Sequence, residues 1–66
     1  MTIRLNGEPF EVTDPATIGT LLELLELDAR RVAVEHNLLV VRREAYGSTP
    51  LQEHDEVEIV NFVGGG

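Results

Sequence analysis

The chain has 66 residues, of which 42% are hydrophobic, and twelve acidic against five basic residues give it a net charge of −7. A domain this small buries only ~60% of its unfolded surface, which excludes a deep catalytic cleft, so we expect one domain over residues 1–66 that is not itself an enzyme. The acidic surface excludes nucleic acid and anionic membranes as partners and favours a basic protein surface, and the absence of cysteine excludes disulfides and thiolate metal sites.

A β-hairpin is the first element expected along the chain. Apolar and polar side chains alternate over residues 2–5 and 10–13, and the intervening Asn6-Gly7 is the strongest short signal for a two-residue turn. Such a turn sets Ile3 opposite Phe10 and places the apolar side chains on one face. No targeting peptide precedes the hairpin and no apolar stretch reaches membrane-spanning length, so we expect a soluble cytoplasmic protein.

One amphipathic helix is expected between Asp14 and Asp28. Its apolar side chains recur at i, i+3, i+4 and i+7, which is the spacing of a helix with one buried side. They are Ile18, Leu21, Leu22 and Leu25. Two starts fit the sequence, because Thr17 can act as N-cap while Thr20 and Glu23 also have the spacing of a capping box.

Three further strands are expected over residues 31–35, 38–41 and 56–62, with residues 42–55 mostly irregular. The order of hairpin, helix and strands predicts an α+β domain in which a mixed sheet of four to five strands wraps over one helix, the β-grasp arrangement. The first and last strands should pair in parallel at the centre of that sheet.

The polar residues do not have the spacing of a catalytic or metal site. His36 and His54 lack a second histidine or a cysteine at ligand spacing and are interpreted as solvated loop residues. Several carboxylates gather between residues 53 and 58 without the pattern of a calcium loop. They are Glu53, Asp55, Glu56 and Glu58. We interpret them as a solvated acidic face that could dock on a basic partner.

The last strand has two apolar positions that a one-helix fold leaves uncovered. If Val57 and Ile59 face the helix, alternation sends Val60 and Phe62 to the opposite face of the sheet. Exposed apolar side chains at this place are typical of a docking patch. The alternative is that Val60 packs on a neighbouring strand residue such as Val41.

Gly64-Gly65-Gly66 follow the last strand after Val63. Glycine loses more backbone entropy on ordering than any other residue and has no side chain, so a glycine run stays loose and fits a narrow channel. We expect residues 63–66 to form a flexible tail, which can span ~13 Å when extended.

These residues together resemble the ThiS family, the ubiquitin-like sulfur carriers of thiamine biosynthesis. The resemblance covers the whole chain and is most specific in its last segment. It rests on Ile3 to Glu8, the helix from Thr17 to Leu25, Val32-Ala33-Val34, Arg43 to Tyr46, Pro50-Leu51 and Asp55 to Gly66. The chain departs from the family pattern at His36-Asn37, Arg42, Tyr46 and His54, which affects the expected turns and leaves the tail unchanged.

The resemblance implies that the chain is a protein co-substrate with no bound cofactor. An enzyme similar to ubiquitin-activating enzymes, the ThiF type, would use ATP and magnesium to adenylate the Gly66 carboxylate, which then becomes a thiocarboxylate. Gly64 and Gly65 would thread the partner's active site, and Val60, Phe62 and Val63 would dock on its surface. A desulfurase or persulfide enzyme would supply the sulfur, and a thiazole synthase would accept it. We expect a monomer when the chain is free.

Three alternatives remain open at the level of the sequence. The small subunit of molybdopterin synthase delivers sulfur from a similar tail, although those chains usually run longer. A ubiquitin-like modifier would join its terminal glycine to a lysine amine. An interaction domain with an inert tail would undergo no ATP-dependent modification.

Overall fold

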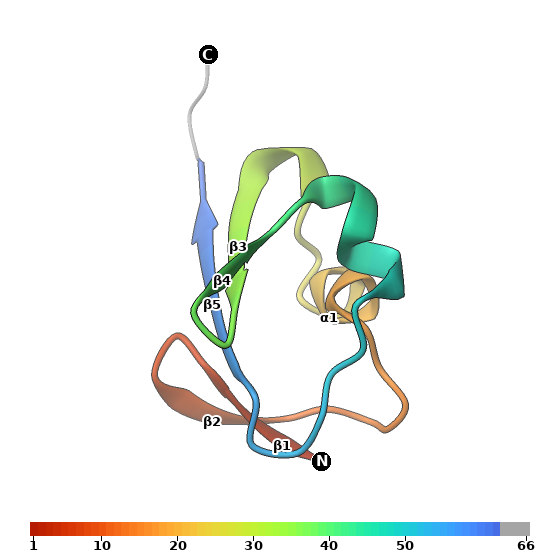
Figure 1. Ribbon diagram of the computed structural model, residues 1–66, viewed down its shortest axis with the longest axis vertical. Helices are drawn as coiled ribbons and strands as arrows, with labels where there is room; N and C mark the ends of the chain where they lie inside the picture. The colour runs from red at the N-terminus through yellow and green to blue at the C-terminus, as the bar shows by residue number, and fades with distance from the viewer. Residues whose placement is uncertain (63–66) are drawn as a thin grey trace.

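The computed structural model describes residues 1–62. Within them, a five-stranded sheet curves over one α-helix, with two short 3₁₀ helices in the connections (Figure 1). The strands are β1 (Thr2–Leu5), β2 (Glu8–Glu11), β3 (Val32–His36), β4 (Leu39–Val41) and β5 (Glu56–Asn61), the α-helix is α1 (Ile18–Leu24), and the 3₁₀ helices are η1 (Ala29–Arg31) and η2 (Arg43–Ser48). The sheet order β2-β1-β5-β3-β4 confirms the expected ubiquitin-like β-grasp fold.

The hairpin of β1 and β2 has the expected register. Ile3 lies opposite Phe10, and Asn6 and Gly7 form the turn with φ of 50° and 86°. These positive values match the twist of a two-residue hairpin loop. The turn also reaches the centre of the sheet, because the Asn6 side-chain oxygen accepts a hydrogen bond from the Ile59 N–H at 2.8 Å.

Helix α1 uses the first of the two possible starts. The Thr17 hydroxyl accepts a hydrogen bond from the Thr20 N–H at 3.1 Å, and the Thr20 hydroxyl accepts one from the Thr17 N–H at 2.7 Å, which forms a capping box. The helix ends earlier than its apolar periodicity indicates. Glu26 takes a left-handed conformation with φ of 59°, and the Leu27 N–H bonds back to the Leu22 carbonyl at 2.9 Å, as in a Schellman motif.

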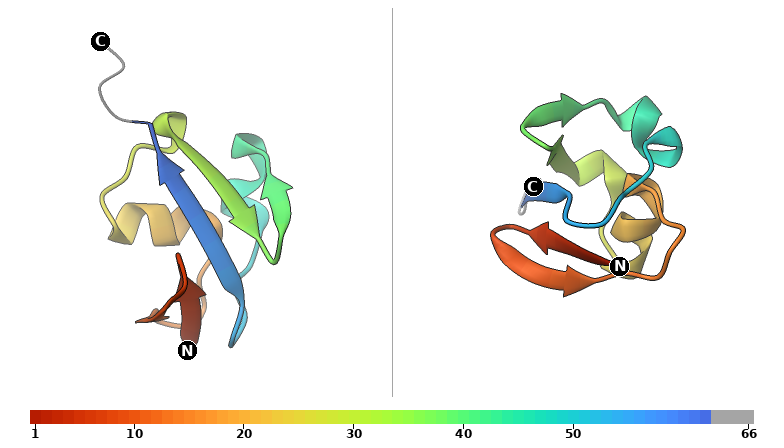
Figure 2. Two further views of the ribbon diagram at one scale, coloured as in Figure 1. Left: turned by 90° about the vertical axis from the view of Figure 1, so that its left-hand side faces the viewer. Right: turned by 60° about the horizontal axis from the view of Figure 1, so that its bottom comes forward.

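Strand β5 occupies the centre of the sheet, parallel to β1 and antiparallel to β3 (Figure 2). The parallel pairing of the first and last strands is therefore confirmed. Val57 and Ile59 point to the helix side and are 0% and 9% exposed. The core that they share with β1, β3 and α1 is largely aliphatic. Its members are Ile3, Val12, Ile18, Leu21, Leu22, Val32, Val34, Tyr46, Leu51, Val57 and Ile59.

The segment between β4 and β5 is more regular than expected, because η2 lies within it. Tyr46 from η2 is buried, with its hydroxyl 3.5 Å from the Val32 carbonyl. A Cβ at Gly19 would lie 3.4 Å from the Gly47 Cα, so glycine allows α1 to pack closely on η2. Over residues 1–62, no helix is long and apolar enough to cross a membrane.

Candidate functional site

The end of β5 fixes the point from which the last residues of the chain follow. Asn61 lies opposite Val32 on β3, and the Phe62 N–H donates a hydrogen bond to the Arg31 carbonyl at 2.7 Å. The backbone is thus anchored as far as Phe62. The remaining residues expected to dock, thread and become activated, Val63, Gly64, Gly65 and Gly66, lie outside the described residues.

Val60 and Phe62 lie on the face of the sheet away from α1 and are 57% and 58% exposed. Val60 lies opposite Ala33, whereas Val41 pairs with the buried Val34. Val41 therefore belongs to the helix side of the sheet and Val60 to the other side. The interpretation in which Val60 packs on Val41 is therefore wrong. The expected exposure of the two side chains is confirmed, and their role in docking stays a prediction.

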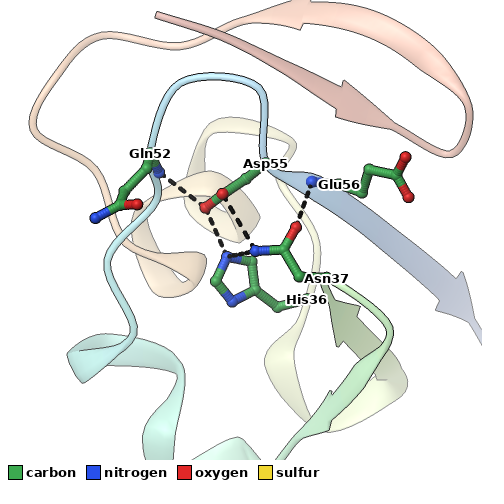
Figure 3. Close-up of polar contacts among 5 residues, drawn as sticks. All are labelled: His36, Asn37, Gln52, Asp55 and Glu56. Atoms are coloured by element: carbon green, nitrogen blue, oxygen red, sulfur yellow. Dashed lines mark hydrogen bonds and ion pairs between the residues drawn. The ribbon is translucent and has the colours of Figure 1, made fainter.

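His36 and Asp55 correct two predictions, because neither is a solvated surface residue. His36 is the last residue of β3, its side chain is 18% exposed, and its Nε2 lies 2.7 Å from Asp55 Oδ2 (Figure 3). The carboxylate also accepts hydrogen bonds from the Asn37 side-chain amide at 3.2 Å and from the Gln52 N–H at 2.9 Å. The antiparallel pairing of β3 with β5 brings the β3–β4 turn beside the loop before β5.

The charge of Asp55 is stabilised by these contacts. Burial alone would raise the pKa of its carboxyl, but the hydrogen bonds from His36, the Gln52 N–H and Asn37 outweigh burial and hold that pKa below its ordinary value. The Asn37 side-chain oxygen in turn accepts a hydrogen bond from the Glu56 N–H at 2.9 Å. The cluster therefore ties the β3–β4 turn to the start of β5, and its position away from the end of β5 indicates a structural role.

The other polar candidates are exposed, as expected. The His54 side chain is 82% exposed and lies 3.7 Å from Glu53, and Glu56 and Glu58 are also exposed. Among residues 1–62, no three histidine, aspartate or glutamate side chains are grouped closely enough to hold a metal ion. The expected acidic face therefore consists of Glu53, Glu56 and Glu58 and does not include the buried Asp55.

Sequence reasoning missed a positively charged end of the molecule. Arg30 and Arg31 lie in η1 just before β3, and Arg42 and Arg43 follow β4. Because β3 and β4 run antiparallel, the start of one lies beside the end of the other. The only signal in the sequence was the position of two Arg-Arg pairs at the ends of expected strands.

Comparison with known proteins places the chain among small sulfur carriers. The model of the ThiS family matches residues 3–66. The chain is 38% identical over 65 residues to the sulfur carrier protein ThiS of Bacillus subtilis, covering 97% of this chain and 98% of that protein. The crystal structure of the thiamine biosynthesis protein ThiS from Geobacter metallireducens matches with a TM-score of 0.84 and 36% identity, covering 100% of both chains.

A longer relative is also similar. The chain is 47% identical over 66 residues to the thiazole synthase of Magnetococcus marinus, but it spans only 20% of that protein's length. The match of the family model over almost the entire chain, together with relatives of nearly equal length, identifies the family. The chain belongs to the ThiS family.

Proposed function

We propose that the chain carries sulfur for thiamine biosynthesis as a thiocarboxylate on Gly66. The role of sulfur carrier follows from membership of the ThiS family and from the likeness to ThiS of Bacillus subtilis. The observation that carries the proposal in this molecule is the end of β5. The central strand is fixed as far as Phe62, the side chains of Val60 and Phe62 are exposed, and three glycines follow Val63 in the sequence.

The chemistry begins with activation of the Gly66 carboxylate, which is a poor electrophile because its displacement would expel oxide. In an adenylating enzyme of the ThiF type, a carboxylate oxygen attacks the α-phosphorus of magnesium-bound ATP, and pyrophosphate leaves. The terminal sulfur of a persulfide on a donor protein then attacks the acyl carbon, and AMP leaves with the C–O bond electrons. A thiol cleaves the resulting acyl disulfide, forms a disulfide with the donor sulfur and releases the thiocarboxylate.

The residues of this chain contribute presentation rather than catalysis. Gly64 and Gly65 lack side chains and so suit a narrow channel in the partner. Val60 and Phe62, with Val63, supply apolar area for docking beside that channel. The chain has no cysteine, so it has no side-chain thiol that could trap the activated carbonyl.

A thiazole synthase is the acceptor that we propose for the sulfur. Support comes from the thiazole synthase of Magnetococcus marinus, in which one fifth of the length resembles this whole chain. The named relatives therefore favour the thiamine pathway over the molybdopterin alternative.

Mass spectrometry of the intact protein tests the proposal. After incubation with the adenylating enzyme of the same organism, ATP, magnesium and a persulfide donor, the chain should gain the mass difference of one sulfur for one oxygen, located at Gly66. A variant lacking Gly65 and Gly66 should not be adenylated, yet its melting temperature should change little, because terminal residues contribute little burial.

A one-residue extension beyond Gly66 is the matched control, since it turns the carboxylate into an amide and leaves the glycines in place. It should also block exchange of pyrophosphate into ATP. Exchange by either variant, or an unchanged mass of the wild-type chain with an enzyme that is active on another carrier, would contradict the proposed function.

A further inference from the structure

The arginines are distributed unevenly over a molecule whose net charge is −7. Four of the five basic residues are at one end of the sheet, and we call this group the arginine end. Its members are Arg30, Arg31, Arg42 and Arg43. The fifth, Arg4, lies in β1 opposite Glu56, the first residue of β5, and is therefore at the other end of the central strand.

The topology places the arginine end beside the last residues of β5. Strand β3 starts at Val32, directly after η1, and Val32 lies opposite Asn61 at the end of β5. Strand β4 runs antiparallel to β3 and therefore points back toward this same end of the sheet, as the left view of Figure 2 shows. The closest link is a backbone hydrogen bond of 2.7 Å from the Phe62 N–H to the Arg31 carbonyl.

A shallow hollow connects these arginines with the apolar residues of the sheet. It has a volume of about 330 Å³, and its lining includes Arg30 and Arg43 with one carboxylate, Glu44, beside the apolar Ala33 and Val40. Ala33, which lines the hollow, pairs with the exposed Val60 across the sheet. The arginine end and the exposed side chains of Val60 and Phe62 thus lie near the same end of the sheet.

Two members of the arginine end have no acidic partner among residues 1–62. Asp28 pairs with Arg30 at 3.0 Å and with Arg31 at 3.8 Å, and the hydrogen bonds from Arg30 lower the pKa of the Asp28 carboxyl to about 2. Arg42 and Arg43 are exposed and form no ion pair with a described residue. Their guanidinium groups are available to carboxylates on another protein, for which arginine has suitable fork geometry.

We propose that the arginine end docks on an acidic surface of the protein that receives the C-terminal residues, beside the mouth of its channel. This inference rests on the proposed function, in which that protein is the adenylating enzyme. It also revises the interpretation drawn from net charge, because the surface nearest the end of β5 is basic although the chain as a whole is acidic. Charges at the rim of an interface steer association and set its orientation.

The test compares two variants that change the net charge equally. Arg42→Gln/Arg43→Gln removes two positive charges from the arginine end, and Arg4→Glu changes the charge by the same amount at the opposite end. Affinity for the adenylating enzyme of the same organism is measured by calorimetry in low salt without ATP, so that nucleotide binding does not contribute. Circular dichroism melts confirm that each variant is folded.

We expect the double variant to bind about five- to twentyfold more weakly, since each exposed ion pair contributes up to about fivefold. Arg4→Glu should stay within about threefold of the wild type. Arg42→Lys/Arg43→Lys keeps both charges and should retain most of the affinity. Raising the salt concentration to about 0.5 M should weaken the wild type more than the double variant, because salt screens exposed pairs.

Binding of Arg42→Gln/Arg43→Gln within twofold of the wild type, or an equal loss for Arg4→Glu, would overturn the inference. Failure of the proposed function gives a different result, because the wild-type chain itself would then support no pyrophosphate exchange. If the wild type is adenylated and the double variant shows an unchanged KM, the function stands and only the arginine docking is wrong.

Discussion

The Asp55→Asn substitution tests how much the buried cluster of His36, Asn37 and Asp55 stabilises the fold. The change keeps the shape of the side chain and replaces one acceptor oxygen by an NH₂ donor. Asp55 Oδ2 accepts from His36 and from the Gln52 N–H, while Oδ1 accepts from Asn37. In one orientation the new NH₂ group faces the Gln52 N–H, and in the other it faces the Asn37 NH₂ group, so a donor meets a donor in both.

The cost follows from the number and type of these hydrogen bonds. Hydrogen bonds to a charged group contribute about 1.5–3 kcal/mol each, and Asp55 is only 8% exposed, so water cannot fully replace them. His36 can present its other tautomer and recover part of the loss. We expect the free energy of unfolding to fall by about 2–4 kcal/mol at neutral pH, a large share of the ~5–15 kcal/mol typical of a domain.

Urea and thermal denaturation at several pH values provide the measurement. A loss of 1 kcal/mol lowers the melting temperature of a domain this small by about 4–8 °C. Because folding holds the pKa of the Asp55 carboxyl below its ordinary value, the stabilisation is present above the unfolded pKa of about 3.9 and is lost as the pH falls through the folded pKa. The difference between wild type and variant should therefore shrink near pH 3.

Glu58→Gln is the matched control, since it makes the same charge change on exposed β5 surface. It should alter the free energy of unfolding by less than about 0.5 kcal/mol. An Asp55→Asn protein as stable as this control at neutral pH would refute the structural role of the cluster. A large difference that persists unchanged at pH 3 would refute the argument from the Asp55 charge.

Two further pairs of substitutions test the surface and the turns. Phe62→Asp should barely change the melting temperature but weaken binding to the adenylating enzyme at least about tenfold. Ile59→Asp, in contrast, buries a charge at a site only 9% exposed and should unfold the domain. A low melting temperature of Phe62→Asp in circular dichroism would contradict the exposed position of Phe62. His54→Gly and Leu38→Gly should each stabilise the fold by up to about 1 kcal/mol in urea titrations. The φ values of 70° at His54 and 73° at Leu38 cost a residue with a side chain about 1–2 kcal/mol, a cost that glycine avoids. The greater flexibility of glycine in the unfolded chain offsets only part of that gain. Destabilisation by either glycine would show that the native side chain compensates for its backbone.

Short-range patterns in the sequence determined most of the fold. Asn6-Gly7 fixed the hairpin register, because few residues adopt the positive φ of both turn positions. Alternation along the last strand determined that Val57 and Ile59 are buried and that Val60 and Phe62 are exposed. These features depend on neighbours within a few residues or on the two-residue period of a strand, so the sequence displays them directly.

Only the tertiary structure decided which distant polar residues meet. His36 and Asp55 are 19 residues apart, and they contact each other because β3 and β5 pair in one particular register. The sequence contains the two residues but not that register, so both were interpreted as solvated. The arginine end arises in the same way, since Arg31 and Arg42 come together only when η1 and the end of β4 reach the same end of the sheet, beside Phe62.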